Sequence, residues 1–143
     1  MKIKPLHPNF KMPVYATNGS AAFDIHAPDS VIIYRNDWVD VNLGFATEIP
    51  EGHVGILAPR SGLGAKFGFK MRNTIGVIDS DYRGEWRATI TIESGNDGEQ
   101  HIIKEGDRIL QCIIVPIRQV WFERVNELSS TKRGDGGYGS TGN

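Results

Sequence analysis

This sequence has a single cysteine, no long apolar run and almost no excess of charge of either sign. Cys112 is the one cysteine among 143 residues, so an intrachain disulfide is impossible. No apolar run approaches the roughly 20 residues of a membrane-spanning helix, and segment 1–5 lacks the apolar core of a signal peptide. The 16 basic and 17 acidic side chains nearly cancel, which argues against a protein that binds nucleic acid through excess positive charge. We therefore expect a soluble, cytoplasmic protein with neither a nucleic-acid nor a membrane partner.

Helix-forming patterns are also scarce, and strand patterns take their place. Proline and glycine recur every few residues, and no long stretch repeats its apolar side chains with the period of a helix. Apolar and polar side chains alternate over 86–93 and over 39–43, which predicts half-buried strands. The sequence allows at most one short helix, near 61–67, with Ser61 as its cap.

Further strands are expected, in chain order, at 31–34, 45–49, 53–58, 109–117 and 119–125. Pro116 should end or bulge its strand because proline has no N–H for the ladder. Segment 73–77 and the segment from Glu85 onward are expected to form a hairpin around a turn at 79–84. Many short strands with regular turns indicate one all-β domain, a sandwich or barrel, with Cys112 as a small hydrophobe in its core.

Glycine is the abundant residue, with 17 in the chain, and it is concentrated in segment 133–143. Five of these eleven residues are glycine, so no apolar face can hold the segment on a core. We expect a β domain over 1–132 followed by a flexible, Gly-rich C-terminal arm over 133–143. The arm is either a disordered tail or a flap that closes on an anion.

Three segments combine glycine with side chains that bind phosphate. Segment 59–64 offers the guanidinium of Arg60, the hydroxyl of Ser61 and backbone N–H groups at Gly62, which suits an anion nest. The second is the arm, with Arg133, Ser140 and Thr141, and the third is Gly106-Asp107-Arg108, which precedes Gln111. A tight turn explains the first segment as well, and a plain turn with an ion pair explains the third.

Two acidic segments, one with Asp24 and one with Asp79 and Asp81, stand apart from the other charges of the chain. Asp24 lies in the apolar segment 21–27, so its carboxylate needs a hydrogen bond or a cation as a partner. Asp79 and Asp81 flank Ser80 at the predicted hairpin turn. They either form Asx turns or hold an attacking water.

Familiar metal and nucleotide motifs are absent. His7, His26, His53 and His101 lack the spacing of zinc ligands, and the sequence contains no Walker A or dinucleotide fingerprint. A metal, if used, would be Mg²⁺ held through phosphates and waters with few protein ligands.

Five segments, in this order, resemble the five motifs of the all-β, trimeric dUTPases (deoxyuridine triphosphate nucleotidohydrolases). They are AAFDIHA at 21–27, PRSGLGAKFG at 59–68, GVIDSDYRGE at 76–85, GDRILQCIIVP at 106–116 and RGDGGYGSTG at 133–142. The resemblance implies a distorted jelly-roll subunit and a homotrimer with active sites at the subunit interfaces. It implies hydrolysis of dUTP to dUMP and pyrophosphate with Mg²⁺, which limits uracil incorporation into DNA and supplies dUMP for dTMP synthesis.

The resemblance also implies a role for each matching residue. Asp79 orients the water that attacks the α-phosphorus, and Asp24 holds the metal through water. The expected substrate-binding residues are Arg60, Ser61, Gly62 and Gln111 for phosphate, Asn73 and Gly76 for the uracil-reading hairpin, Tyr82 under the deoxyribose, and Arg133, Tyr138, Gly139, Ser140 and Thr141 in the arm.

Two departures from the family pattern keep the chemical groups: Ala22 replaces the usual Gly, and Tyr138 the usual Phe. A related family with this fold deaminates dCTP, but the sequence shows no extra carboxylate for that chemistry. A non-catalytic β module that binds nucleotide or protein is the third reading of the sequence.

Overall fold

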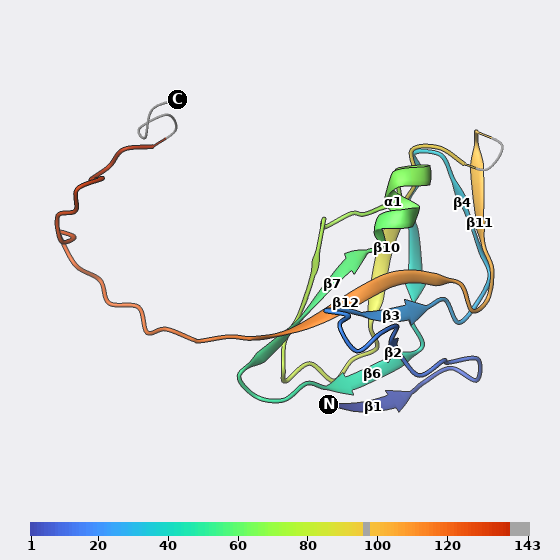
Figure 1. The fold of residues 1–143 in the computed structure, drawn as a ribbon, viewed down its shortest axis with the longest axis horizontal. Helices are drawn as coiled ribbons and strands as arrows, with labels where there is room; N and C mark the ends of the chain where they lie inside the picture. The colour runs from blue at the N-terminus through green and yellow to red at the C-terminus, as the bar shows by residue number, and fades with distance from the viewer. Residues whose placement is uncertain (96–97, 138–143) are drawn as a thin grey trace.

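The computed structural model describes residues 1–95 and 98–137, and among them α1 (Ser61–Phe67) is the one helix. The rest of the regular structure is β (Figure 1). The strands are β1 (Lys2–Pro5), β2 (Val14–Tyr15), β3 (Phe23–His26), β4 (Val31–Tyr34), β5 (Val39–Asn42), β6 (Phe45–Glu48), β7 (His53–Pro59), β8 (Lys70–Met71), β9 (Gly76–Ile78), β10 (Arg87–Thr91), β11 (Gln100–Ile103) and β12 (Arg108–Pro116).

These strands form small, mostly antiparallel sheets. The largest has the order β2-β3-β12-β7-β9, and a three-stranded sheet has the order β5-β10-β8. Two further pairs, β1 with β6 and β11 with β4, complete the body. The expected all-β, distorted jelly-roll fold with one short helix is confirmed.

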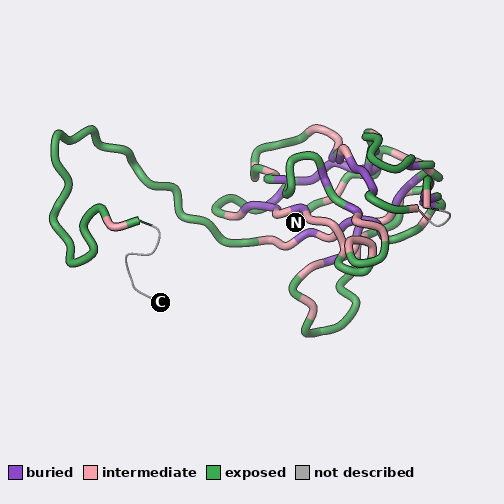
Figure 2. Tube along the Cα trace, turned by 90° about the horizontal axis from the view of Figure 1, so that it is seen from above, coloured by how far each residue is buried: buried purple, intermediate pink, exposed green. Residues whose placement is uncertain are grey.

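The core lies between the sheets, and Trp86 is its largest fully buried side chain. Its ring packs at 5.0 Å from that of Phe45, and its indole N–H donates to the buried hydroxyl of Thr47 at 3.1 Å. Cys112 is buried in the same core, as expected, and burial raises the pKa of its thiol to about 12. Figure 2 shows that the buried residues are confined to the body and that the described part of the C-terminal segment is almost entirely exposed.

The central strand β12 brings the candidate site residues into register. It pairs with β3 on one side and β7 on the other, so that Gln111 lies opposite both Asp24 and Ala58. A register shift between Arg108 and Leu110 interrupts the strict alternation of the strand. Ile109 and Leu110 can therefore both be buried although they are neighbours.

Two expectations about local structure are wrong: the cap of the helix and the predicted hairpin. The helix is found at the predicted place, but Arg60 and not Ser61 occupies the N-cap, and no side chain caps it. Segments 73–77 and 85 onward do not pair with each other: β9 joins β7, whereas β10 joins β5 and β8. Burial of Trp86 draws the second segment into the other sheet.

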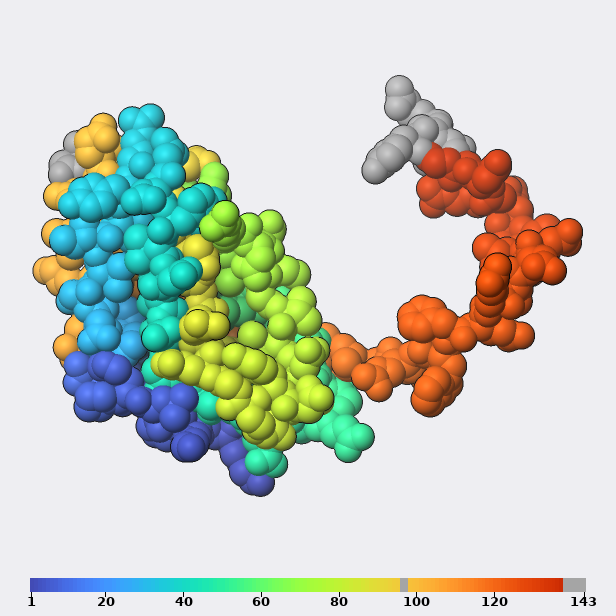
Figure 3. Space-filling model, turned by 180° about the vertical axis from the view of Figure 1, so that it is seen from behind, coloured from blue at the N-terminus to red at the C-terminus, as the bar shows by residue number. Residues whose placement is uncertain are grey.

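The strand expected at 119–125 is also wrong. The described chain has no strand after Pro116, where β12 ends as proline predicts. Beyond β12 it runs away from the body (Figures 1 and 3). Within this segment Trp121 and Phe122 are 101% and 96% exposed, because no second strand of this copy lies beside them.

No helix within the described part of the chain is long and apolar enough to cross a membrane.

The buried contact between Trp86 and Thr47 generates a stability prediction. Replacing Thr47 with valine keeps the volume but leaves the buried indole N–H without an acceptor, so the free energy of unfolding should fall by about 1–3 kcal/mol. Urea denaturation followed by tryptophan fluorescence measures this loss. Thr89→Val is the control, because the Thr89 hydroxyl donates to Asp40 at the exposed surface, where water can replace it. Equal losses in the two variants would contradict the role of the buried bond.

Candidate functional site

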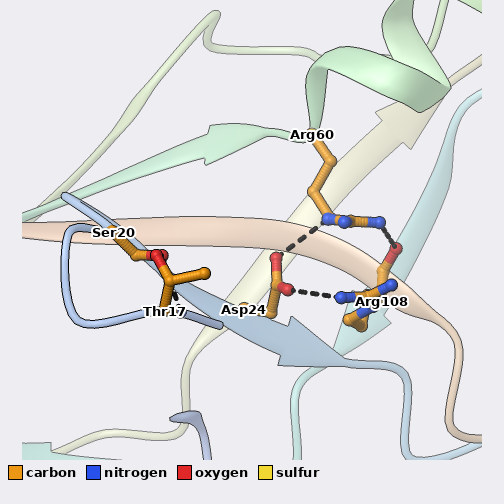
Figure 4. A network of polar contacts seen from close by, with 5 residues as sticks. All are labelled: Thr17, Ser20, Asp24, Arg60 and Arg108. Atoms are coloured by element: carbon orange, nitrogen blue, oxygen red, sulfur yellow. Dashed lines mark hydrogen bonds and ion pairs between the residues drawn. The ribbon is translucent and has the colours of Figure 1, made fainter. Parts of the chain in front are cut away.

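Asp24 lies at the centre of a charged network at the end of β7 (Figure 4). Its Oδ1 atom is 2.8 Å from Nε of Arg60, and its Oδ2 atom is 3.1 Å from Nη1 of Arg108. The Asp24 side chain is 14% exposed. A carboxylate this far removed from water needs cationic or hydrogen-bonding partners, and two guanidinium groups supply them.

Arg60, Ser61, Gly62 and Gln111 gather beside Asp24 around one cavity of about 400 Å³. The backbone turns from β7 into α1 at Arg60, so the guanidinium and the exposed Ser61 and Gly62 follow directly after Pro59. The Gln111 amide donates to the Pro59 carbonyl oxygen at 3.0 Å. A Cβ added to Gly62 would meet no atom within 4 Å, so packing does not require glycine there, and a ligand can approach the backbone closely.

His26 adds no positive charge to this region near neutral pH. Burial lowers its pKa, as do the charges of Lys11, Arg108 and Arg60, against an opposing effect of Asp24. The Nδ1 atom is buried and has no hydrogen-bond partner. The Asp24 network therefore carries one negative and two positive charges, and its net positive charge favours an anion in the cavity.

Asp79 and Tyr82 lie together in the turn between β9 and β10 and line a different cavity, of about 260 Å³. The turn is braced by Nη1 of Arg83, which donates to the carbonyl oxygens of Ser80 at 2.7 Å and Tyr82 at 3.1 Å. The Tyr82 hydroxyl donates to the Glu85 carbonyl oxygen at 3.1 Å. A Cβ at Gly84 would collide with the Tyr82 ring, so this glycine makes room for the ring.

Within one chain the two groups lie at opposite ends of β7. Ile78 pairs with Gly55 near the start of the strand, whereas Arg60 follows its last residue. At the rise of a β-strand, the residues between them separate Asp79 from Arg60 by about 20 Å. Within one copy of the chain, the carboxylate of Asp79 therefore lies far from the cavity that Arg60 lines beside Asp24.

Asn73 and Gly76 are placed separately again. Asn73 lines a third cavity with Asp40, Arg72 and Arg87. Gly76 is buried against Leu57, where an added Cβ would approach the Leu57 Cβ to 3.0 Å. Close packing of β9 on β7 is therefore a sufficient reason for glycine at this position.

The described part of the arm, residues 133–137, lies far from these cavities in this copy (Figure 1). Arg133 donates from Nε to the Gly136 carbonyl oxygen at 3.0 Å within a local turn. The other arm residues expected at the site, namely Tyr138, Gly139, Ser140 and Thr141, lie outside the described residues.

The donor set fits a metal only through water. Over 1–95 and 98–137, no group of three or more His, Cys, Asp or Glu side chains could hold a metal ion. Among the described residues, Asp24 is the one carboxylate that lines its cavity, and each of its oxygens already contacts a guanidinium. A carboxylate oxygen has two lone pairs, so Asp24 can still accept a hydrogen bond from a water of a phosphate-bound Mg²⁺.

Arg108 is the residue whose place in the site the sequence reasoning did not find. The sequence reads as an ion pair with the adjacent Asp107, but Asp107 accepts from the backbone N–H of Lys104 at 2.8 Å instead. The partner of Arg108 is Asp24, 84 positions away in the chain. The one sequence signal for this pair was that Asp24, among apolar neighbours, needs a partner. That signal does not identify which residue is the partner.

Comparison with known proteins shows which family the chain is similar to. The dUTPase family model matches residues 8–142. A deoxyuridine 5'-triphosphate nucleotidohydrolase of Anaplasma marginale is 42% identical over 92% of this chain and 88% of its own. One from Nautilia profundicola is also 42% identical, over 99% of this chain and 98% of its own.

Solved structures show the same relationship. The dUTPase of Staphylococcus bacteriophage 80alpha, in a structure with dUpNHpp, superposes with a TM-score of 0.88 at 28% identity, over 99% of this chain and 97% of that one. With a family model that spans nearly the whole sequence and relatives of this similarity, the chain belongs to the dUTPase family.

Proposed function

We propose that this protein hydrolyses dUTP to dUMP and pyrophosphate, which keeps uracil out of DNA and supplies dUMP for dTMP synthesis. The observation that carries the proposal is the cavity where Arg60, Ser61, Gly62 and Gln111 meet beside Asp24, in a chain of the dUTPase family. The similar phage enzyme, solved with the dUTP analogue dUpNHpp, supports dUTP as the substrate. Because its substrate is a DNA precursor, we also propose a cytoplasmic location.

In this proposal the cavity beside Asp24 binds the triphosphate. Arg60 contributes a forked guanidinium, Ser61 a hydroxyl, Gly62 an approachable backbone N–H and Gln111 an amide. Mg²⁺ bound to the phosphates would neutralise part of their charge, and Asp24 would accept a hydrogen bond from one of its waters. These residues fix the α-phosphorus and offset charge that develops on its non-bridging oxygens.

Asp79 acts on the water. Its carboxylate accepts a hydrogen bond from the water, aims the oxygen at the α-phosphorus and takes up the proton as the new P–O bond forms. The bond from the α-phosphorus to the bridging oxygen breaks, and pyrophosphate leaves with the electron pair. Tyr82 packs under the deoxyribose, and Asn73 and Gly76 hold the hairpin that reads uracil.

We propose a homotrimer whose active sites lie at the subunit interfaces. The separation of about 20 Å between Asp79 and Arg60, derived above from the length of β7, supports this assembly: a complete site needs the Asp79 turn of one copy against the Arg60 cavity of another. The exposed Trp121 and Phe122 support it too, because adjacent bare aromatic side chains are favourable only when a partner covers them.

The segment 133–143 is proposed as an arm that closes over the site after the substrate binds, on a β domain of residues 1–132. Arg133, Ser140 and Thr141 would contact the γ-phosphate, Tyr138 would stack on the uracil, and Gly139 would allow close approach. Late closure excludes water and completes the positive charge around the triphosphate.

A pyrophosphate-release assay across dUTP, dTTP, dCTP and UTP tests the function. We expect turnover of dUTP alone, at a rate that depends on Mg²⁺. Deoxyuridine products from dCTP would identify a deaminase instead, and binding of dUTP without turnover would identify a non-catalytic module.

Asp79→Asn should lose nearly all hydrolysis while it still binds dUpNHpp, because the amide cannot take up the proton of the water but leaves the phosphate cavity unchanged. Steady-state turnover and calorimetry measure the two effects. Asp81→Asn is the control, since it changes the neighbouring carboxylate of the same turn. A turnover rate of Asp79→Asn equal to that of the wild type would rule out the proposed role.

Mixed trimers test whether sites are shared between copies. Arg60→Gln and Asp79→Asn should each be inactive alone. When co-expressed they should regain roughly a quarter of wild-type activity, the fraction of sites that combine both intact residues in randomly mixed three-fold trimers. No recovery in purified mixed trimers would place both residues of a site in one copy.

Tyr82→Ala should hydrolyse UTP more readily relative to dUTP, because the ring no longer fills the space of a 2′-hydroxyl. Tyr82→Phe keeps the ring and should retain the discrimination. The ratio of kcat/KM for the two substrates is the measurement, and an equal ratio in wild type and Tyr82→Ala would exclude the ring as the sugar gate.

A further inference from the structure

Arg60 gives its Nε–H to Asp24, so it has to loosen that contact before it can turn its full set of N–H donors toward the triphosphate. In this structure Nε of Arg60 contacts Oδ1 of Asp24 at 2.8 Å (Figure 4). The proposed function, on which this inference rests, requires the same guanidinium to turn toward phosphate oxygens. Asp24 is only 14% exposed, so water could replace little of the lost contact, and a part-buried charge without a cation is unfavourable.

Arg108 lies where it can remain paired with Asp24 when Arg60 moves. It contacts Oδ2 of Asp24, the oxygen that Arg60 leaves untouched, and its side chain is half exposed at the rim of the same cavity. Its backbone belongs to β12, where it pairs with His26 two residues beyond Asp24. The guanidinium of Arg108 can therefore keep the carboxylate while that of Arg60 moves.

We propose that Arg108 is a positioning residue, which holds Asp24 in place and so frees Arg60 to bind the triphosphate. The two arginines are also linked directly, since Nη1 of Arg60 donates to the Arg108 carbonyl oxygen at 3.4 Å. Without Arg108, Asp24 would have Arg60 as its remaining guanidinium partner, and each bound triphosphate would have to compete with Asp24 for it.

The test measures binding of dUpNHpp by calorimetry in EDTA, so that no metal contributes. Arg108→Gln should bind it about tenfold more weakly, the effect expected for one charge-assisted contact. Deoxyuridine, which has no phosphate, should bind with unchanged affinity. Arg35→Gln is the matched control, because Arg35 is paired with Glu99 at the exposed surface at 3.8 Å, and it should bind both ligands as the wild type does.

A double-mutant cycle separates positioning from direct phosphate contact. In an Asp24→Asn background Arg60 is already released, so adding Arg108→Gln should change the affinity for dUpNHpp little. If Arg108 touched phosphate itself, its replacement would cost the same in both backgrounds, and that result would overturn the proposal. Arg108→Lys keeps the charge, should lose less affinity, and replaces Arg108→Gln in the cycle if melting curves show that the latter does not fold.

The two proposals fail in different ways. A wild-type protein that neither binds dUpNHpp nor hydrolyses dUTP would refute the proposed function and this inference with it. A wild-type protein that does both, beside an Arg108→Gln variant of undiminished affinity, would refute the role of Arg108 alone.

Discussion

The double pairing of β12 is the constraint on which the rest of the structure depends. One strand of nine residues lies between β3 and β7, and its register sets Gln111 opposite Asp24 on one side and Ala58 on the other. That single alignment brings together segments that are remote in the chain. The apolar side chains of the same strand are anchored in the core, so a slip by one residue would expose them and scatter the site at once.

The same sheet explains why Asp79 lies far from Arg60 within one copy. β9 adds to the far side of β7, and its pairing begins at Gly55 and ends at Leu57, which directs the Asp79 turn toward the start of β7 and away from Arg60. A rigid sheet cannot bend to close such a gap. In the homotrimer we propose, the Asp79 turn of one copy meets the Arg60 cavity of another, and the exposed Trp121 and Phe122 after β12 offer aromatic surface for such a contact.

What the sequence predicts well here is local. Alternation identified the strand that buries Trp86, Ala88, Ile90 and Ile92, and the apolar run around Cys112 indicated a core position. Pairing partners are not encoded locally, so the hairpin predicted from two nearby segments proved to be two strands in different sheets. Segment 119–125 has the composition of a strand, but a strand needs a neighbour, and this copy offers none.

Asp24 shows the same limit in the site itself. Its apolar surroundings predict a partner, yet one partner, Arg60, follows the end of β7, and the other, Arg108, begins β12, 84 positions away. Two guanidinium groups contact one carboxylate, and His26 beside them is neutral. The network therefore has a net positive charge next to the cavity. A carboxylate in an anion site would by itself repel the ligand. With Arg108 on its other oxygen, Asp24 stays paired when Arg60 turns to the triphosphate, so no unpaired carboxylate is left beside the ligand.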